Sequence, residues 1–161
     1  MKDKVWNALR NAKLGVEYTA LYSLKVKNRR NLYKKITLLT AFAGMVVFIF
    51  WQPAALIACI IIFLGELLVK FTSRIILSDN DLLKLGDLKI RYVQLFNKLE
   101  RLMIDINDDC LPQDEVNKLY SQILNNKIEI EHLEQDITLP HNQTFKAQAE
   151  QLTDAYLTDL F

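Results

Sequence analysis

Residues 36–51 read ITLLTAFAGMVVFIFW, residues 52–53 are Gln-Pro, and residues 54–69 read AALIACIIIFLGELLV. The first run has no charged side chain, and Glu66 is the only ionisable acid or base in the second. Because Pro fixes φ and disrupts helix interiors, the Gln-Pro pair divides the stretch into two runs joined by a tight turn.

Sixteen residues of helix measure about 24 Å, which is near the short limit for a bilayer core of about 30 Å. Flanking residues such as Tyr33 and Phe71 would extend the spans. We therefore predict a transmembrane hairpin over residues 36–71, with helices at 36–51 and 53–71. A buried hairpin of a soluble domain is the alternative, but a chain of this size can hardly surround so many uncharged residues.

Basic residues flank both runs, which places both termini on the cytoplasmic side. Lys70 and Arg74 follow the second run, and Trp51 suits the opposite interface. The cluster before the first run, called the basic flank below, consists of Lys25, Lys27, Arg29, Arg30, Lys34 and Lys35. This flank has two further interpretations, namely attraction of anionic lipid heads and recognition of nucleotide phosphates by Arg29 and Arg30.

Charge is divided unevenly along the 161 residues. Residues 1–77 hold 12 basic and 3 acidic side chains, and residues 78–161 hold 8 basic and 16 acidic ones. The four Gly are too far apart for a dinucleotide or P-loop fingerprint. Two Cys and two His give no zinc-site spacing, and no nucleophile motif is present. We expect neither an enzyme nor a cofactor, and no nucleic acid as a partner.

Glu66 has two interpretations. It can lie at the inner headgroups and pair with Lys70 one helical turn later. Alternatively, Ala55, Cys59, Ile62 and Glu66 share a helix face, so a ring of such helices would place carboxylates at the mouth of an opening. A separate small-residue face in the first run permits close helix approach and consists of Thr37, Thr40, Ala41 and Gly44.

The region 72–161 shows helical periodicity. Apolar residues alternate at spacings of three and four over residues 82–107, and a second stripe follows over 112–138. These helices are expected to form an antiparallel pair, with Asn126 either fixing the register or lying at a solvent edge. We predict that the first stripe also forms an oligomer seam, through Leu85, Leu88, Tyr92, Leu95, Leu99, Leu102 and Ile106.

Two further helices complete the predicted fold. Residues 1–35 show apolar residues at helical intervals without Pro, and residues 143–160 form a last amphipathic segment that docks on the others. We find no strand-like alternation of useful length. The sequence therefore predicts an all-α protein, in which long flanking helices form a cytoplasmic bundle or coiled coil around a two-helix transmembrane hairpin.

The order of these features resembles the SLATT family, small two-transmembrane effectors of bacterial conflict systems. The resemblance covers about residues 10–137. It rests on Tyr18 and Tyr22 in the first helix, the basic stretch ending at Tyr33, the apolar hairpin, Phe71, and Gly86, Tyr92, Leu95 and Glu100 in the following helix.

The resemblance implies an effector of the bacterial inner membrane that oligomerises and permeabilises the bilayer on infection, in abortive anti-phage defence. It also implies a partner that senses infection or produces a nucleotide signal. The alternative function is a membrane-anchored coiled-coil scaffold or regulatory subunit that recruits a cytoplasmic partner.

Overall fold

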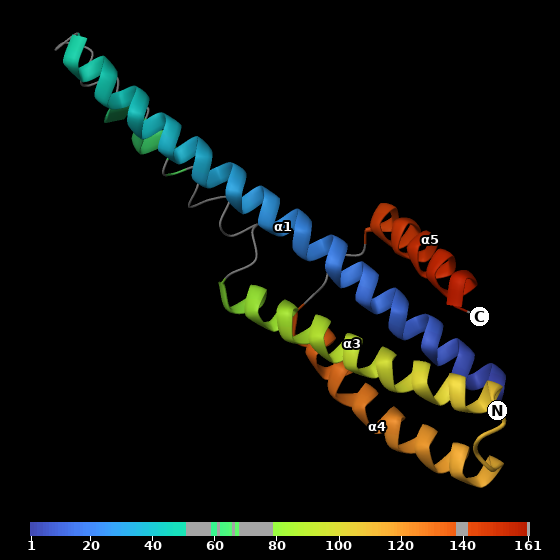
Figure 1. Ribbon diagram of the computed structural model, residues 1–161. Helices are drawn as coiled ribbons and strands as arrows, with labels where there is room; N and C mark the ends of the chain where they lie inside the picture. Colours follow the sequence, from blue (N-terminus) through green and yellow to red (C-terminus); the bar gives the residue numbers. More distant parts are fainter. Residues whose placement is uncertain (51–58, 61, 66, 68–78, 138–141, 161) are drawn as a thin grey trace. The chain divides into compact units, whose positions relative to one another are not determined.

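The computed structural model describes residues 1–50, 59–60, 62–65, 67, 79–137 and 142–160. The long helices among these residues are α1 (Lys2–Phe50), α3 (Asp79–Asn107), α4 (Gln113–Ile137) and α5 (Gln143–Leu160) (Figure 1). No strand occurs among the described residues, and the all-α prediction is confirmed. The predicted ends of the last three helices differ from the observed ones by at most three residues, close to the usual uncertainty of helix ends.

The chain divides into two compact units, and α1 runs through both. Residues Met1–Ser23 and Asp81–Phe161 form the first unit, called the helical bundle below, and Leu24–Asn80 form the second. The sequence grouped residues 1–35 as a segment of their own. In the structure the first 23 residues belong with the C-terminal helices, because their apolar side chains supply part of the bundle core.

The core of the bundle forms where α1 packs against α3. Val5, Leu9 and Ala12 lie one helical turn apart on α1 and are almost fully buried. Gly15 continues this face, and a Cβ built on it would lie only 2.3 Å from Cε1 of Tyr92. The absence of a side chain at Gly15 therefore lets the tyrosine ring pack directly on the α1 backbone.

Helix α4 packs beside α3 in the predicted antiparallel direction. Its four buried residues are branched aliphatics seven positions apart, Val116, Ile123, Ile130 and Ile137. Ion pairs join Lys84 to Asp136 and Arg91 to Glu129, so a step of seven up α3 matches a step of seven down α4. Burial of each aliphatic side chain contributes roughly 1.5–3 kcal/mol, which makes this stripe the main attachment of α4.

A tight turn joins α3 to α4. The N–H of Cys110 donates to the carbonyl of Asp105 at 3.0 Å, and the N–H of Asp109 donates to that of Ile106 at 3.4 Å. This is the Schellman pattern of a helix end, and Asp109 has the left-handed φ of 52° that it requires. The carbonyl of Pro112 then accepts the first hydrogen bonds of α4.

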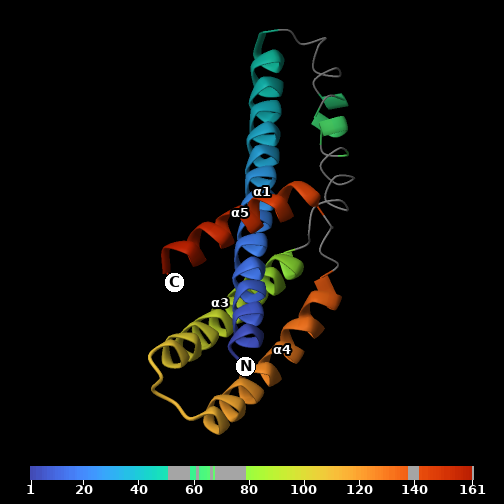
Figure 2. The ribbon, with the colours of Figure 1, turned by 90° about the vertical axis from the view of Figure 1, so that its right-hand side faces the viewer.

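Helix α5 docks on the flank of the α1–α3 pair away from α4, as Figures 1 and 2 show. The side chain of Asn142 caps its first turn by accepting from the N–H of Thr144 at 3.0 Å. Helix α5 buries three residues, Ala149, Thr153 and Leu157, and only one of them is a large aliphatic, compared with the four branched aliphatics of α4. The predicted docking of the last helix on the others is therefore observed, through a thinner apolar contact.

The α3 stripe assigned to an oligomer seam is buried within the single chain. Leu85, Leu88 and Leu99 are at most 1% exposed, and Leu95 and Leu102 are also buried. A stripe of this periodicity marks a buried face without telling whether the covering helix belongs to the same chain. In the structure other helices of the bundle cover it, and a role of the stripe in self-association stays a prediction.

The predicted hairpin lies only partly within the described residues. Helix α1 covers the first predicted span as far as Phe50, and helical residues at 59–60, 62–65 and 67 fall in the second. Glu66, Lys70 and Arg74 lie outside the described part. Among the helices that are described, a search for one long and apolar enough to cross a membrane finds no candidate.

Candidate functional site

The second unit carries large apolar side chains on its surface. Leu38 and Leu39 of α1 are each 74% exposed and Phe42 is 68% exposed. Phe63, in the following helical segment, is 64% exposed. Single exposed leucines are common in proteins, but a continuous stretch of such residues marks a surface made for an apolar partner.

Thr40 and Gly65 bring the two helical segments of this unit together. A Cβ built on Gly65 would lie 3.9 Å from Oγ1 of Thr40, which is an ordinary van der Waals distance. Thr40 belongs to the small-residue face predicted from the sequence, whereas Gly65 was not singled out as its neighbour. The two residues are 25 positions apart in the sequence, and only the structure identifies them as neighbours.

The polar side chains on this stretch of α1 are satisfied within their own helix. The hydroxyl of Thr37 donates to the carbonyl of Tyr33 at 3.0 Å, and that of Thr40 donates to the carbonyls of Ile36 and Thr37 at 3.0 and 2.9 Å. Hydroxyls bonded in this way need no water. The stretch can therefore enter an apolar environment without leaving an unsatisfied donor.

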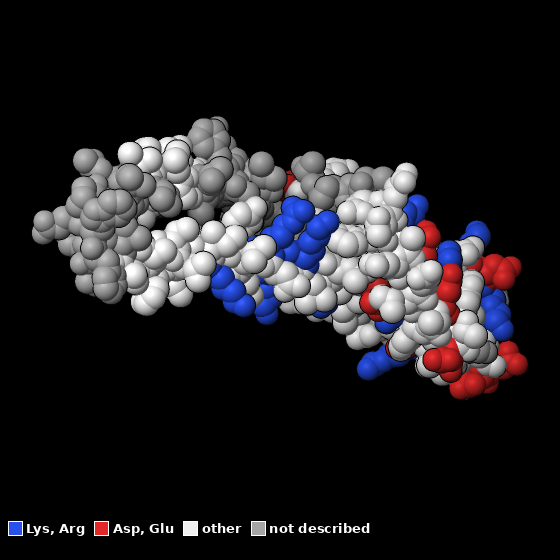
Figure 3. Space-filling model, turned by 90° about the horizontal axis from the view of Figure 1, so that it is seen from above, with Lys and Arg blue, Asp and Glu red and all other residues white. Residues whose placement is uncertain are grey.

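The basic flank lies on α1 immediately before the apolar stretch. Four of its cations are exposed, namely Lys27, Arg29, Lys34 and Lys35. Lys25 and Arg30 are half-buried and take part in further interactions. Figure 3 shows Lys and Arg side chains (blue) gathered beside surface formed by uncharged residues (white). The sequence has no Asp or Glu between Glu17 and Glu66, so the flank has no acidic neighbour along the chain.

Charged residues of the bundle, in contrast, hold its helices together. Both guanidinium nitrogens Nε and Nη2 of Arg10 donate to the carboxylate of Asp154, at 2.9 and 3.2 Å. This hydrogen bond is the main reason that the pKa of Asp154 lies below its ordinary value. The ammonium of Lys13 lies 3.9 Å from the ring centre of Tyr156, so two cations of α1 anchor α5.

The acidic residues of α4 serve the same purpose on the other flank. The hydroxyl of Tyr92 donates to Glu134 at 2.5 Å, and burial, followed by this hydrogen bond, raises the pKa of Tyr92. Arg91 pairs with Glu129, and Lys84 with Asp136. Three acidic residues of α4, Glu129, Glu134 and Asp136, therefore tie α4 to α3.

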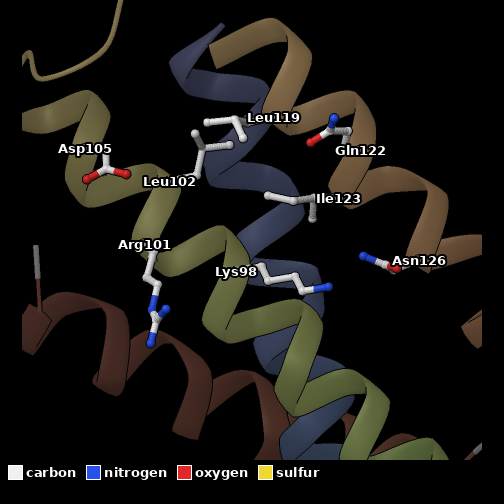
Figure 4. A pocket seen from close by; sticks show the side chains of 8 residues that line it. All are labelled: Lys98, Arg101, Leu102, Asp105, Leu119, Gln122, Ile123 and Asn126. Carbon is white, nitrogen blue, oxygen red and sulfur yellow. The ribbon is translucent and has the colours of Figure 1, made fainter. Parts of the chain in front are cut away.

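Two of the hollows on the surface of the bundle are lined by described residues. One, of about 510 Å³, lies between α1, α3 and α4 over Ala12, Leu95 and Ile130. The other, of about 330 Å³, is a groove between α3 and α4 in which Leu102, Leu119 and Ile123 point into the space between the helices (Figure 4).

Asn126, the predicted polar interruption of the α4 stripe, lines the α3–α4 groove and is half-buried. Its position therefore lies between the two interpretations drawn from the sequence, at the edge of the contact and not in its centre. Both cysteines, Cys59 and Cys110, are free and exposed. Among the described residues no group of three or more His, Cys, Asp or Glu is arranged to hold a metal ion.

Comparisons with protein families, curated proteins and solved structures find no match to this chain. The candidate site therefore consists of an exposed apolar stretch, the approach of Gly65 to Thr40, and the basic flank.

Proposed function

We propose that residues 36–71 insert into a bilayer as a two-helix hairpin and carry the helical bundle on the cytoplasmic side. The observation that carries the proposal is the exposure of Leu38, Leu39 and Phe42 on the helix that buries Val5 and Leu9 near its start. Exposed apolar surface is unfavourable in water by about 25 cal/mol per Å², and lipid removes this penalty.

The Thr40–Gly65 contact supports the hairpin over two separate helices. Thr40 is twelve residues before Gln52, and Gly65 is twelve residues after Pro53. A turn at Gln52-Pro53 brings residues at equal distances from it side by side. Small residues are favoured where membrane helices approach closely, because backbone contacts then replace side-chain packing.

A charged residue within the apolar stretch tests the insertion. Phe42→Asp places a carboxylate about two turns beyond Lys35, where biological insertion scales assign a penalty of roughly 2.5–3.5 kcal/mol. We expect the variant to leave the membrane fraction in large part. Leu83→Asp is the matched control, because Leu83 is as exposed as Leu39 but lies on α3 of the bundle. Equal membrane retention of both variants would contradict the proposal.

We further propose that the chain is an effector of the bacterial inner membrane that oligomerises and permeabilises the bilayer. The resemblance to SLATT effectors and the lone carboxylate Glu66 in the second apolar run support this activity. On this proposal an infection sensor or a nucleotide-signal producer releases the activity. Induced expression is expected to cause dye influx and loss of membrane potential, and Phe42→Asp is expected to abolish both.

A membrane-anchored scaffold is the second candidate, favoured by the open groove between α3 and α4. Leu102 and Ile123 form its floor, and Lys98 and Arg101 of α3 lie along it (Figure 4). A scaffold would leave the membrane potential unchanged on induction and would lose its partner when Leu119→Asp charges the groove. Dye influx that persists in Leu119→Asp would favour the effector.

A further inference from the structure

Four exposed cations of the basic flank differ from the cations of the bundle in making no ion pair with a described residue. In the bundle, Arg10, Lys13 and Arg91 each lie within 3.0 Å of a carboxylate oxygen. Within the described part of the chain, Lys27, Arg29, Lys34 and Lys35 make no ion pair. Four exposed cations within nine residues repel one another, so a ligand that brings negative charge to them is favoured.

The position of these four cations on α1 matches the headgroup layer of a bilayer. Lys35 directly precedes Ile36, the first residue of the apolar run, and Lys27 lies eight residues earlier. At 1.5 Å per residue this separation is about 12 Å. Headgroups extend about 5–8 Å beyond the hydrocarbon, and the Debye length adds about 8 Å. All four cations therefore lie within reach of headgroup charge.

The four positions also spread around the helix. At 3.6 residues per turn, Lys27, Lys34 and Lys35 point to one side of α1 and Arg29 points to another. A groove for one small ligand would gather its cations on a single face. Cations on opposite sides of the helix instead suit a continuous layer of phosphates surrounding it, and the guanidinium of Arg29 can bind a phosphate through two hydrogen bonds.

We infer that Lys27, Arg29, Lys34 and Lys35 bind the headgroups of anionic phospholipids and give the chain a preference for membranes that contain them. The inference rests on the proposed insertion of residues 36–71, because the apolar run is what brings the flank to the headgroup layer. It adds to that proposal the class of lipid that the protein selects.

Titration of the full chain in detergent with phosphatidylglycerol or with phosphatidylcholine tests this selection. Micelles doped with either lipid are added, and binding is followed by microscale thermophoresis. Each cation near an anionic surface is worth about fivefold in affinity, so we expect the wild-type chain to prefer phosphatidylglycerol by more than about tenfold. Raising the salt from about 0.1 M to about 1 M shortens the Debye length from ~10 Å to ~3 Å and should remove most of the preference.

Two sets of substitutions with the same change in charge locate the binding. The test variant combines Lys27→Gln, Arg29→Gln, Lys34→Gln and Lys35→Gln and is expected to bind both lipids equally. The control variant neutralises four exposed cations of the bundle by Lys2→Gln, Lys4→Gln, Lys118→Gln and Lys146→Gln. It is expected to keep the wild-type preference. An equal loss in both variants would show that net charge, and not the flank, selects the lipid.

Two further outcomes would overturn the inference. A wild-type chain that binds both lipids equally has no headgroup selectivity. A chain that binds a short RNA more tightly than phosphatidylglycerol, through the same four cations, recognises nucleic acid instead. Because the titration is done in detergent, its failure is separate from failure of insertion, which Phe42→Asp tests.

Discussion

The two halves of α1 contain the same kinds of apolar residue and expose them in opposite ways. In the bundle, Val5 and Leu9 have no exposed surface, because they lie in the core that α1 forms with the C-terminal helices. Beyond the basic flank, Leu39 and Phe42 are 74% and 68% exposed on the same unbroken helix. The comparison teaches that helix formation does not require burial, since one helix continues from residues packed in the bundle to residues that no described part of the protein covers.

The cations of α1 also differ between its two halves in whether they contact other residues. Arg10 and Lys13 in the first half contact residues of α5. In the second half the exposed cations of the basic flank make no ion pair with described residues, and no charged residue follows Lys35 within α1. A protein environment explains the first half, and a bilayer with its headgroups is the environment that suits the second.

The largest expected difference in unfolding free energy comes from replacing one leucine by alanine in each half of α1. Leu9→Ala leaves a cavity in the bundle core and should cost about 2–5 kcal/mol of unfolding free energy. Leu39→Ala removes an exposed side chain and should change the stability of the bundle by less than about 0.5 kcal/mol. Urea unfolding in mild detergent, followed by circular dichroism, measures both. Similar losses would mean that the two halves share one protein environment.

Two glycines at helix contacts provide a sharper version of the comparison. Gly15→Ala forces a Cβ to within 2.3 Å of the Tyr92 ring and should destabilise the bundle by about 1–3 kcal/mol. Gly65→Ala meets Thr40 only at 3.9 Å, so the better helix propensity of alanine, worth up to about 1 kcal/mol, should prevail. Thermal unfolding in detergent checks both signs, and a stabilising Gly15→Ala would show that the ring moves away easily.

The smallest expected effect concerns two buried threonines. Among the described residues, the hydroxyl of Thr153 on α5 is buried without a hydrogen-bond partner, so Thr153→Val should stabilise the bundle by about 1 kcal/mol. The hydroxyl of Thr19 in the first half of α1 donates to the carbonyls of Gly15 and Val16 at 2.8 and 3.0 Å. Thr19→Val should therefore destabilise by a similar amount. Calorimetry of both variants would contradict this assignment if they shifted the melting temperature in the same direction.

Local patterns in the sequence predicted much of the helical fold. The seven-residue spacing of Val116, Ile123 and Ile130 defines the buried face of α4, and Pro112 marks its start. Periodicity reports which face of a helix is covered, and this information is local. The antiparallel packing of α3 and α4 followed from their similar lengths and short connection.

The sequence could not predict which helix covers each apolar helix face, because this depends on contacts between residues far apart in the sequence. The α3 stripe containing Leu88 and Leu99 fitted a partner chain as well as helices of the same chain. Gly15 gave no local sign of the tyrosine that packs on it. Likewise, Arg10 and Asp154 are 144 residues apart, and only the docking of α5 brings them together.

The accessibility of introduced thiols tests the central claim, the membrane hairpin, most directly. In a chain carrying Cys59→Ser and Cys110→Ser, single thiols are introduced by Gln52→Cys or Lys2→Cys, and spheroplasts are treated with a membrane-impermeant maleimide. The account predicts labelling of Gln52→Cys in intact spheroplasts and of Lys2→Cys only after permeabilisation. Labelling of Lys2→Cys from outside would contradict the topology, and recovery of the chain in the soluble fraction would contradict the hairpin itself.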